Sequence, residues 1–236
     1  MRLFGSETMN SMLEKLGLKD GESIDHPWIN KAIERAQQKV EARNFDIRKT
    51  LIKFDNVLND QRHVIFEQRK NVIDGKEKEN YSDIFLEEVL DNLKRQKILH
   101  EKSPNSKEFP NTIKQILGKS IENDELDNIL NSDLKVMEKT IKDKFTKNRE
   151  ERNNLLGVEQ GNEIEKRILV QIIDQNWKSH IQYLEQLRQV IGLRSYGQRD
   201  PLVEYKKEAF VLFENLLAKL KTDLVTMLLN LRIIEK

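Results

Sequence analysis

Cysteine is absent from this 236-residue sequence, and glycine (9 residues) and proline (4 residues) are scarce. Without cysteine there can be no disulfide bonds, no cysteine-ligated zinc and no thiol catalysis. With so few glycines and prolines to interrupt helix-forming residues, the composition predicts an all-α fold. Long apolar runs are also missing, so we predict neither a signal peptide nor a transmembrane segment, and we expect a soluble, cytoplasmic chain.

The sequence has no excess of charge of one sign. Its 41 basic and 40 acidic residues give a net charge of +1, too small to attract nucleic acid or anionic lipid to the whole chain. The basic-rich run at residues 139–152 includes Asp143, Glu150 and Glu151 at helical spacing, which favours a solvated helix face over an anion-binding patch. We therefore expect no nucleic-acid partner.

Motifs for catalysis and cofactor binding are missing too. No glycine-rich loop with lysine and serine or threonine follows a strand pattern, so we expect no nucleotide site in this chain. Asp174 and His180 lie about 120° apart around a helix and cannot share one metal ion, and His63 with Glu67 lacks a third donor. The sequence therefore predicts no catalytic residues, no metal and no cofactor here.

Helical periodicity dominates the first third of the chain. Residues 1–25 look like a connector, Asp25-His26-Pro27 is typical of a helix start, and no glycine or proline follows before Gly75. This pattern predicts one long helix over residues 26–74, roughly 70 Å in length. Its apolar stripe has gaps filled by Asn44 and Gln61, and any part left exposed would favour self-association.

Two further segments follow the long helix. Residues 75–159 contain shorter helical patterns broken by glycine and proline, which predicts a small helical subdomain, the wing. Residues 160–236 predict an antiparallel two-helix hairpin, with helices at about 162–191 and 201–234 and a tip at 192–200. Asp200 and Pro201 are suited to the N-cap and first position of the second helix.

Two groups of residues in the hairpin are candidates for function. Trp177 and His180 lie three residues apart, so they can form one packed, hydrogen-bonding face against another helix. The tip combines apolar and basic side chains, and Tyr196 could either contact another polypeptide or pack back onto the hairpin. The tip candidates are Leu193, Arg194, Ser195, Tyr196, Gly197 and Gln198.

Several of these motifs resemble the SecA family, the motor that drives unfolded preproteins through the bacterial SecYEG channel. The long helix carries His26-Pro27-Trp28, Asn44–Lys49 and Asp60-Gln61-Arg62. The hairpin carries Trp177, His180, Leu193-Arg194, Tyr196, Gln198, Asp200-Pro201 and Glu204-Tyr205-Lys206. Phe54 and Phe66 stand where the family often has tyrosine, and Val190 stands where glycine is expected.

The resemblance implies a helical scaffold, a wing and a two-helix finger without the ATPase motor, which would hold ATP and Mg²⁺. It implies that the tip, Leu193 to Gln198, contacts the translocating preprotein, and that the long helix couples to the SecA motor domains through Asn44, Asp46, Arg48 and Lys49. SecYEG would be a further partner, and the location would be the bacterial cytoplasm, peripheral on the inner membrane.

Two expectations remain open at this level. A freestanding helical adaptor or coiled-coil interaction protein, with no motor attached, is the alternative to a translocase fragment. We expect Leu217→Ala or Ile172→Ala to melt the hairpin locally while the wing persists. Loss of all helicity in either variant would instead indicate one cooperative unit.

Overall fold

The computed structural model describes residues 27–74, 81–103, 107–118 and 123–232, apart from the side chains of residues 28, 29, 123, 195 and 196. Within these ranges the secondary structure is helical and contains no strand, which confirms the all-α prediction. The predicted connector at 1–25 lies outside the described residues. The chain divides into two compact units, residues 1–53 and 54–236.

The first long element is helix α2 (Pro27–Asp74), which is continuous over 48 residues. Residues 27–53 of α2 belong to the first unit, and most of their side chains are exposed, including Asn44, Asp46, Arg48 and Lys49. Large apolar side chains are exposed there as well, among them Phe45 and Ile52. The rest of α2 belongs to the second unit.

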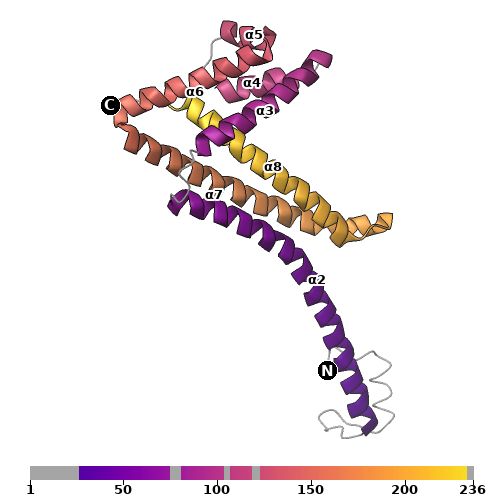
Figure 1. Cartoon of the computed structure of the whole chain (residues 1–236). Coiled ribbons are helices and arrows are strands. Elements are labelled where there is room, and N and C mark those ends of the chain that lie inside the picture. The colour runs from indigo at the N-terminus through magenta and orange to yellow at the C-terminus, as the bar shows by residue number, and fades with distance from the viewer. Residues whose placement is uncertain (1–26, 75–80, 104–106, 119–122, 233–236) are drawn as a thin grey trace. The chain divides into compact units, whose positions relative to one another are not determined.

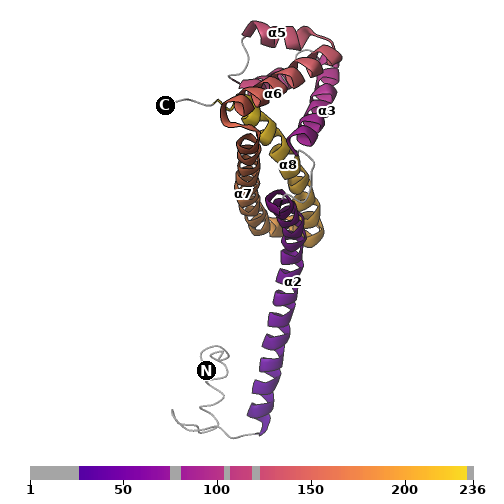
Figure 2. The ribbon, with the colours of Figure 1, turned by 60° about the vertical axis from the view of Figure 1, so that its left-hand side comes forward.

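The hairpin consists of α7 (Val158–Val190), the short 3₁₀ helix η2 (Ile191–Gly197) and α8 (Pro201–Asn230). In Figures 1 and 2 the chain turns at η2, and α8 returns along α7. The carboxylate of Asp200 accepts a hydrogen bond of 2.8 Å from the Leu202 amide, with Pro201 next in the chain, which confirms the predicted cap.

The first hairpin helix begins about four residues earlier than the expected position 162. The helix break falls at Gly157, whose φ of 88° favours glycine, and not at Gly161. Gly161 lies buried inside α7, where an added Cβ would stand 2.1 Å from the Asn153 side-chain oxygen. Gly161 therefore permits close packing of α7 against α6. The second hairpin helix, α8, ends at Asn230, four residues before the expected position 234.

The wing is built from α3 (Tyr81–Lys102), α4 (Glu108–Leu117), α5 (Asn123–Asn131) and α6 (Leu134–Leu156). Of these, α3, α4 and α6 contact α8, and α5 packs on α4 and α6. Figures 1 and 2 show the wing gathered around the C-terminal part of α8, away from η2.

Wing and hairpin share one hydrophobic core. Beyond residue 220, α8 buries two adjacent faces, with Val225 and Leu229 beside Leu224 and Leu228, so it can pack on α7 and on the wing at once. The same core takes in Ile65 from α2. The fully buried wing side chains in it include Leu90, Leu93, Phe109, Ile113, Met137 and Phe145. This continuity is at odds with separate melting of hairpin and wing.

A buried ionic cluster strengthens the same junction. Glu165 of α7 accepts hydrogen bonds from Arg152 (2.8 Å) and Arg149 (3.1 Å) of α6, and from Ser82 of α3 (2.7 Å). Burial acts to raise the pKa of Glu165, but these donors and the positive charges outweigh it, so the net pKa is lowered and the carboxylate stays ionised at neutral pH. Arg152 also donates to the Leu228 carbonyl at 2.9 Å, near the end of α8.

We predict that Leu224→Ala lowers the free energy of unfolding by about 2–5 kcal/mol, because Leu224 is fully buried and its truncation leaves a cavity in the core. Urea unfolding followed by far-UV circular dichroism and by tryptophan fluorescence should give one coincident transition. Leu99→Ala, at a position 63% exposed on α3, is the control and should change stability little. Two separated transitions in Leu224→Ala would contradict the shared core.

Candidate functional site

The second part of α2 runs antiparallel to α7, and a series of contacts fixes their register. As the residue number rises along α2, the number of its contact residue on α7 falls, as expected for antiparallel helices. The pairs are Asp55 with Arg188 (3.2 Å), Gln61 with His180 (2.8 Å), Phe66 with Trp177 (6.5 Å between ring centroids), Arg69 with Asp174 (2.8 Å) and the Ile73 carbonyl with Lys166 (2.7 Å). These contacts cover most of the length of α7.

Gln61 is the buried centre of this series. Its amide nitrogen donates to the backbone carbonyl of Ala209 on α8 at 3.0 Å, and its amide oxygen lies 2.8 Å from His180 Nε2 on α7. Only 8% of Gln61 is exposed, and 3% of His180. One side chain thus joins three helices by two hydrogen bonds. We call this arrangement the Gln61 bridge.

The protonation of His180 follows from its surroundings. Because Gln61 donates to the Ala209 carbonyl, its oxygen faces the imidazole and must receive a hydrogen, so Nε2 of His180 carries the proton. Burial lowers the pKa of His180, which keeps the ring neutral at physiological pH. The ring packs between Trp177 (5.5 Å) and Phe213 (5.9 Å), measured between ring centroids.

A second buried cluster anchors the hairpin next to its tip. It contains Leu184, Leu187, Ile191, Tyr205 and Ala209, and α2 contributes Phe54, Val57 and Leu58. The rings of Phe54 and Tyr205 meet edge to face at 4.9 Å. Phenylalanine at position 54 thus packs through its ring alone. This cluster fastens the base of η2 to both hairpin helices and to α2.

The tip projects beyond this cluster. Ile191, the first residue of η2, is buried, whereas Leu193 is 65% exposed and Arg194, Gly197 and Gln198 are exposed as well. The backbone of Ser195 and Tyr196 lies in η2, but their side chains are outside the described part of the structure. The two predicted orientations of Tyr196, outward or packed back on the hairpin, therefore both stay predictions.

The other predicted residues occupy different surroundings. Trp177 and His180 are buried between α2, α7 and α8, where they pack on each other. The coupling candidates Asn44, Asp46, Arg48 and Lys49 are exposed on residues 27–53 of α2. Sequence reasoning missed Gln61 and Ala209. The polar Gln61 within an apolar stripe was the available signal, but nothing in the sequence named the carbonyl that it would reach.

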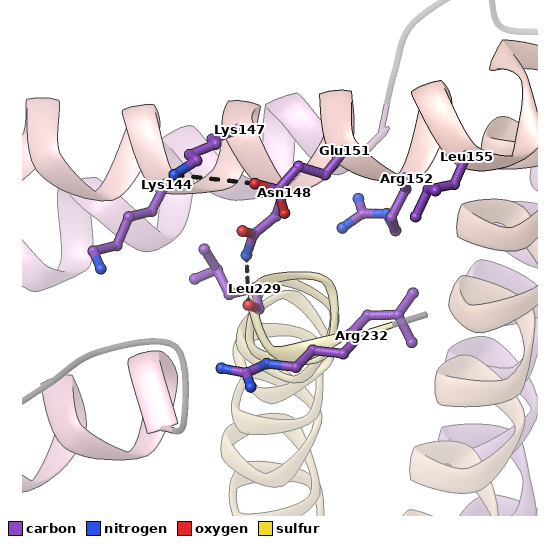
Figure 3. Close-up of a pocket in the computed structure, with 9 residues that line it drawn as sticks. Lys144, Lys147, Asn148, Glu151, Arg152, Leu155, Leu229 and Arg232 are labelled. Atoms are coloured by element: carbon purple, nitrogen blue, oxygen red, sulfur yellow. Dashed lines mark hydrogen bonds and ion pairs between the residues drawn. The ribbon is translucent and has the colours of Figure 1, made fainter. Parts of the chain in front are cut away.

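The basic run of α6 lines a cavity of about 460 Å³ together with the end of α8 (Figure 3). Lys144, Lys147 and Arg152 face this cavity, and each has an acidic partner: Glu125 at 2.7 Å, Glu151 at 4.0 Å and Glu165 at 2.8 Å, respectively. The basic residues of the run that face this cavity are therefore paired with acidic groups.

Among the described helices, none combines the length and apolar character that crossing a membrane requires. In the same part of the chain, histidine, aspartate and glutamate side chains form no group of three or more that could hold a metal ion.

These features define an all-α module in which the second part of a long helix is fastened along a two-helix hairpin that shares its core with a helical wing. The chain belongs to the SecA family, because the model of the SecA wing and scaffold domain matches residues 23–232.

Curated relatives agree with this assignment. The protein translocase subunit SecA of Pelagibacter ubique (strain HTCC1062) is 61% identical over all 236 residues of the chain, which cover 28% of that relative. The corresponding subunit of Bartonella bacilliformis is 43% identical, and subunit SecA 1 of Rhodopseudomonas palustris (strain BisA53) is 44% identical; the matches cover the whole chain and 26% and 25% of these relatives. The chain thus spans about a quarter of the length of the curated relatives that it matches.

We predict that Gln61→Leu lowers the free energy of unfolding by about 1–3 kcal/mol, because it leaves the buried Nε2–H of His180 without an acceptor. Chemical denaturation measures the change. Gln68→Leu makes the same replacement at an exposed position of α2 and should have a small effect. Equal destabilisation by the two variants would show that the Gln61 bridge contributes nothing specific.

Proposed function

We propose that this chain is the part of a SecA-type translocase that couples an ATP-driven motor to the movement of unfolded preprotein through the SecYEG channel. The observation that supports it best is the series of contacts from Asp55 to Ile73, which fastens α2 along α7, with the Gln61 bridge extending it to α8. A displacement of α2 would then carry the hairpin with it. Independent support comes from the names of the relatives, all of which are protein translocase subunits.

In this proposal the tip touches the moving polypeptide. Leu193 offers exposed apolar surface, and the sequence adds Tyr196, whose amphipathic ring suits contact with varied side chains because it needs area more than exact geometry. Ser195, Gly197 and Gln198 complete the contacting segment, and Arg194 flanks it. The buried cluster at Ile191 and Tyr205 gives this segment a firm base.

The motor side of the coupling lies on the exposed first part of α2. Asn44, Asp46, Arg48 and Lys49 are the residues that we propose contact the motor domains. We assign ATP and Mg²⁺ to that motor, because the sequence of this chain has no phosphate-binding loop. The assembly would work in the bacterial cytoplasm, peripheral on the inner membrane. The exposed apolar side chains of residues 27–53 also make self-association possible in the isolated chain.

We predict that Tyr196→Ala reduces preprotein transport at least roughly tenfold, an energetic change of about 1.4 kcal/mol at the limiting step. The variant is placed in the Pelagibacter ubique SecA protein after this chain replaces its corresponding segment, and transport into inverted inner-membrane vesicles is measured. Nucleotide binding and thermal stability should not change, since the substitution lies at the tip.

Tyr183→Ala is the matched control, because Tyr183 is 59% exposed on α7 and lies outside the tip. It should transport normally. Normal transport by Tyr196→Ala, or an equal loss in both variants, would contradict the proposed role of the tip.

A further inference from the structure

Two arginines stand on either side of residues 195–198, the centre of the tip, and reach back to the same helix. Arg194, within η2, lies 2.9 Å from the carboxylate of Glu208, and Arg199, just past η2, lies 3.1 Å from that of Glu204. Glu204 and Glu208 are four residues apart on α8, so they stand on one face one turn apart. Between the two arginines the chain contains only Ser195, Tyr196, Gly197 and Gln198.

The backbone between the two ion pairs adopts conformations that need support. η2 extends over seven residues, whereas 3₁₀ helices rarely exceed four. Gln198 has a φ of 57°, and it is the one non-glycine residue with positive φ in the described part of the chain. Such a conformation persists where surrounding contacts enforce it. Ile191 is buried at one end of this stretch and Asp200 forms its cap at the other, and the two ion pairs lie between them.

We propose that Glu204 and Glu208 are positioning residues that hold the tip in its projecting conformation through Arg199 and Arg194. This inference rests on the proposed function of the tip, to which it adds the residues that orient it. Neither carboxylate needs to touch the polypeptide itself. Their effect is to restrict the conformations of Ser195 to Gln198.

We call the two ion pairs, Arg194 with Glu208 and Arg199 with Glu204, the clasp, and electrostatics favour its second pair. Glu204 lies in the first turn of α8, where a negative charge is favourable, and it also approaches Lys207 at 3.5 Å. The hydrogen bond from Arg199 is the main reason that the pKa of Glu204 is lowered, so the carboxylate stays charged. Both arginines are more than half exposed, so each pair is weak alone and sensitive to salt. With one pair on each side of the four-residue segment, the two pairs together restrict its conformation.

The first test measures tip mobility without reference to transport. The chain has no cysteine, so Ser195→Cys gives one attachment site for a nitroxide, whose electron paramagnetic resonance line shape reports mobility. Glu208→Gln should increase this mobility, and the exchange of Arg194→Glu with Glu208→Arg should reverse most of the increase. High salt should mobilise the tip of the labelled chain that keeps Glu208, and it should have less effect on the labelled Glu208→Gln variant.

Glu214→Gln, at an exposed position further along α8, is the control and should leave the line shape unchanged. Thermal melts of all variants establish that they are folded. Identical line shapes in Glu208→Gln and Glu214→Gln would overturn the proposed clasp, whatever the transport measurements show.

The second test measures transport in the same Pelagibacter ubique replacement protein. Glu208→Gln should slow transport roughly three- to tenfold. A more mobile tip with normal transport would overturn the positioning role while leaving the effect of Tyr196→Ala intact. Normal transport by Tyr196→Ala would instead remove the function on which this inference rests.

Discussion

The side-chain amide of Gln61 joins α2 to both helices of the hairpin, at residues 119 and 148 positions further along the chain. It accepts a hydrogen bond from His180 on α7 and donates one to the Ala209 carbonyl on α8, in a site from which water is largely excluded. A buried polar group without a partner is costly, so this geometry disfavours any sliding of α2 along the hairpin. The position of Phe54 against Tyr205, and thereby the base of the tip, depends on that register.

The opposite end of the hairpin is held by the wing. Three side chains bind backbone carbonyls where α8 and α4 end: Arg152 binds Leu228, Asn148 binds Leu229, and Asn230 binds Ile116. Such carbonyls lack partners within their own helices, so these bonds satisfy groups that would otherwise need water. Together with the shared core, they make wing, hairpin and the second part of α2 one compact unit.

Much of this architecture could be predicted from local patterns. The scarcity of glycine and proline gave the helical class, Pro27 and Gly75 bracketed the long helix, and Asp200 with Pro201 marked the start of α8. The expected start of the first hairpin helix, at about residue 162, is four residues late, because Gly161 lies inside α7 and packs against Asn153. Local propensity does not distinguish a glycine that packs inside a helix from one that ends it.

The tertiary features were harder to predict for a physical reason. The partner of Gln61 on α8 is a backbone carbonyl, which has no sequence signature, and the apolar positions of α8 do not reveal whether they face α7 or the wing. Similarly, the spacing of Arg194, Arg199, Glu204 and Glu208 acquires meaning only when η2 turns the chain back. Contacts across the chain, and not helix patterns, determine the candidate site.

The central claim is that the second part of α2, residues 54–74, and the hairpin move as one body, and a distance measurement tests it most directly. Nitroxide labels at Val64→Cys on α2 and Tyr183→Cys on α7 occupy exposed positions within the same unit. In the replacement protein, freed of other reactive cysteines, double electron–electron resonance should give one narrow distance distribution that is the same at rest and during ATP-driven transport. A shift or a second distance during transport would show that the hairpin moves relative to α2, and it would contradict the account.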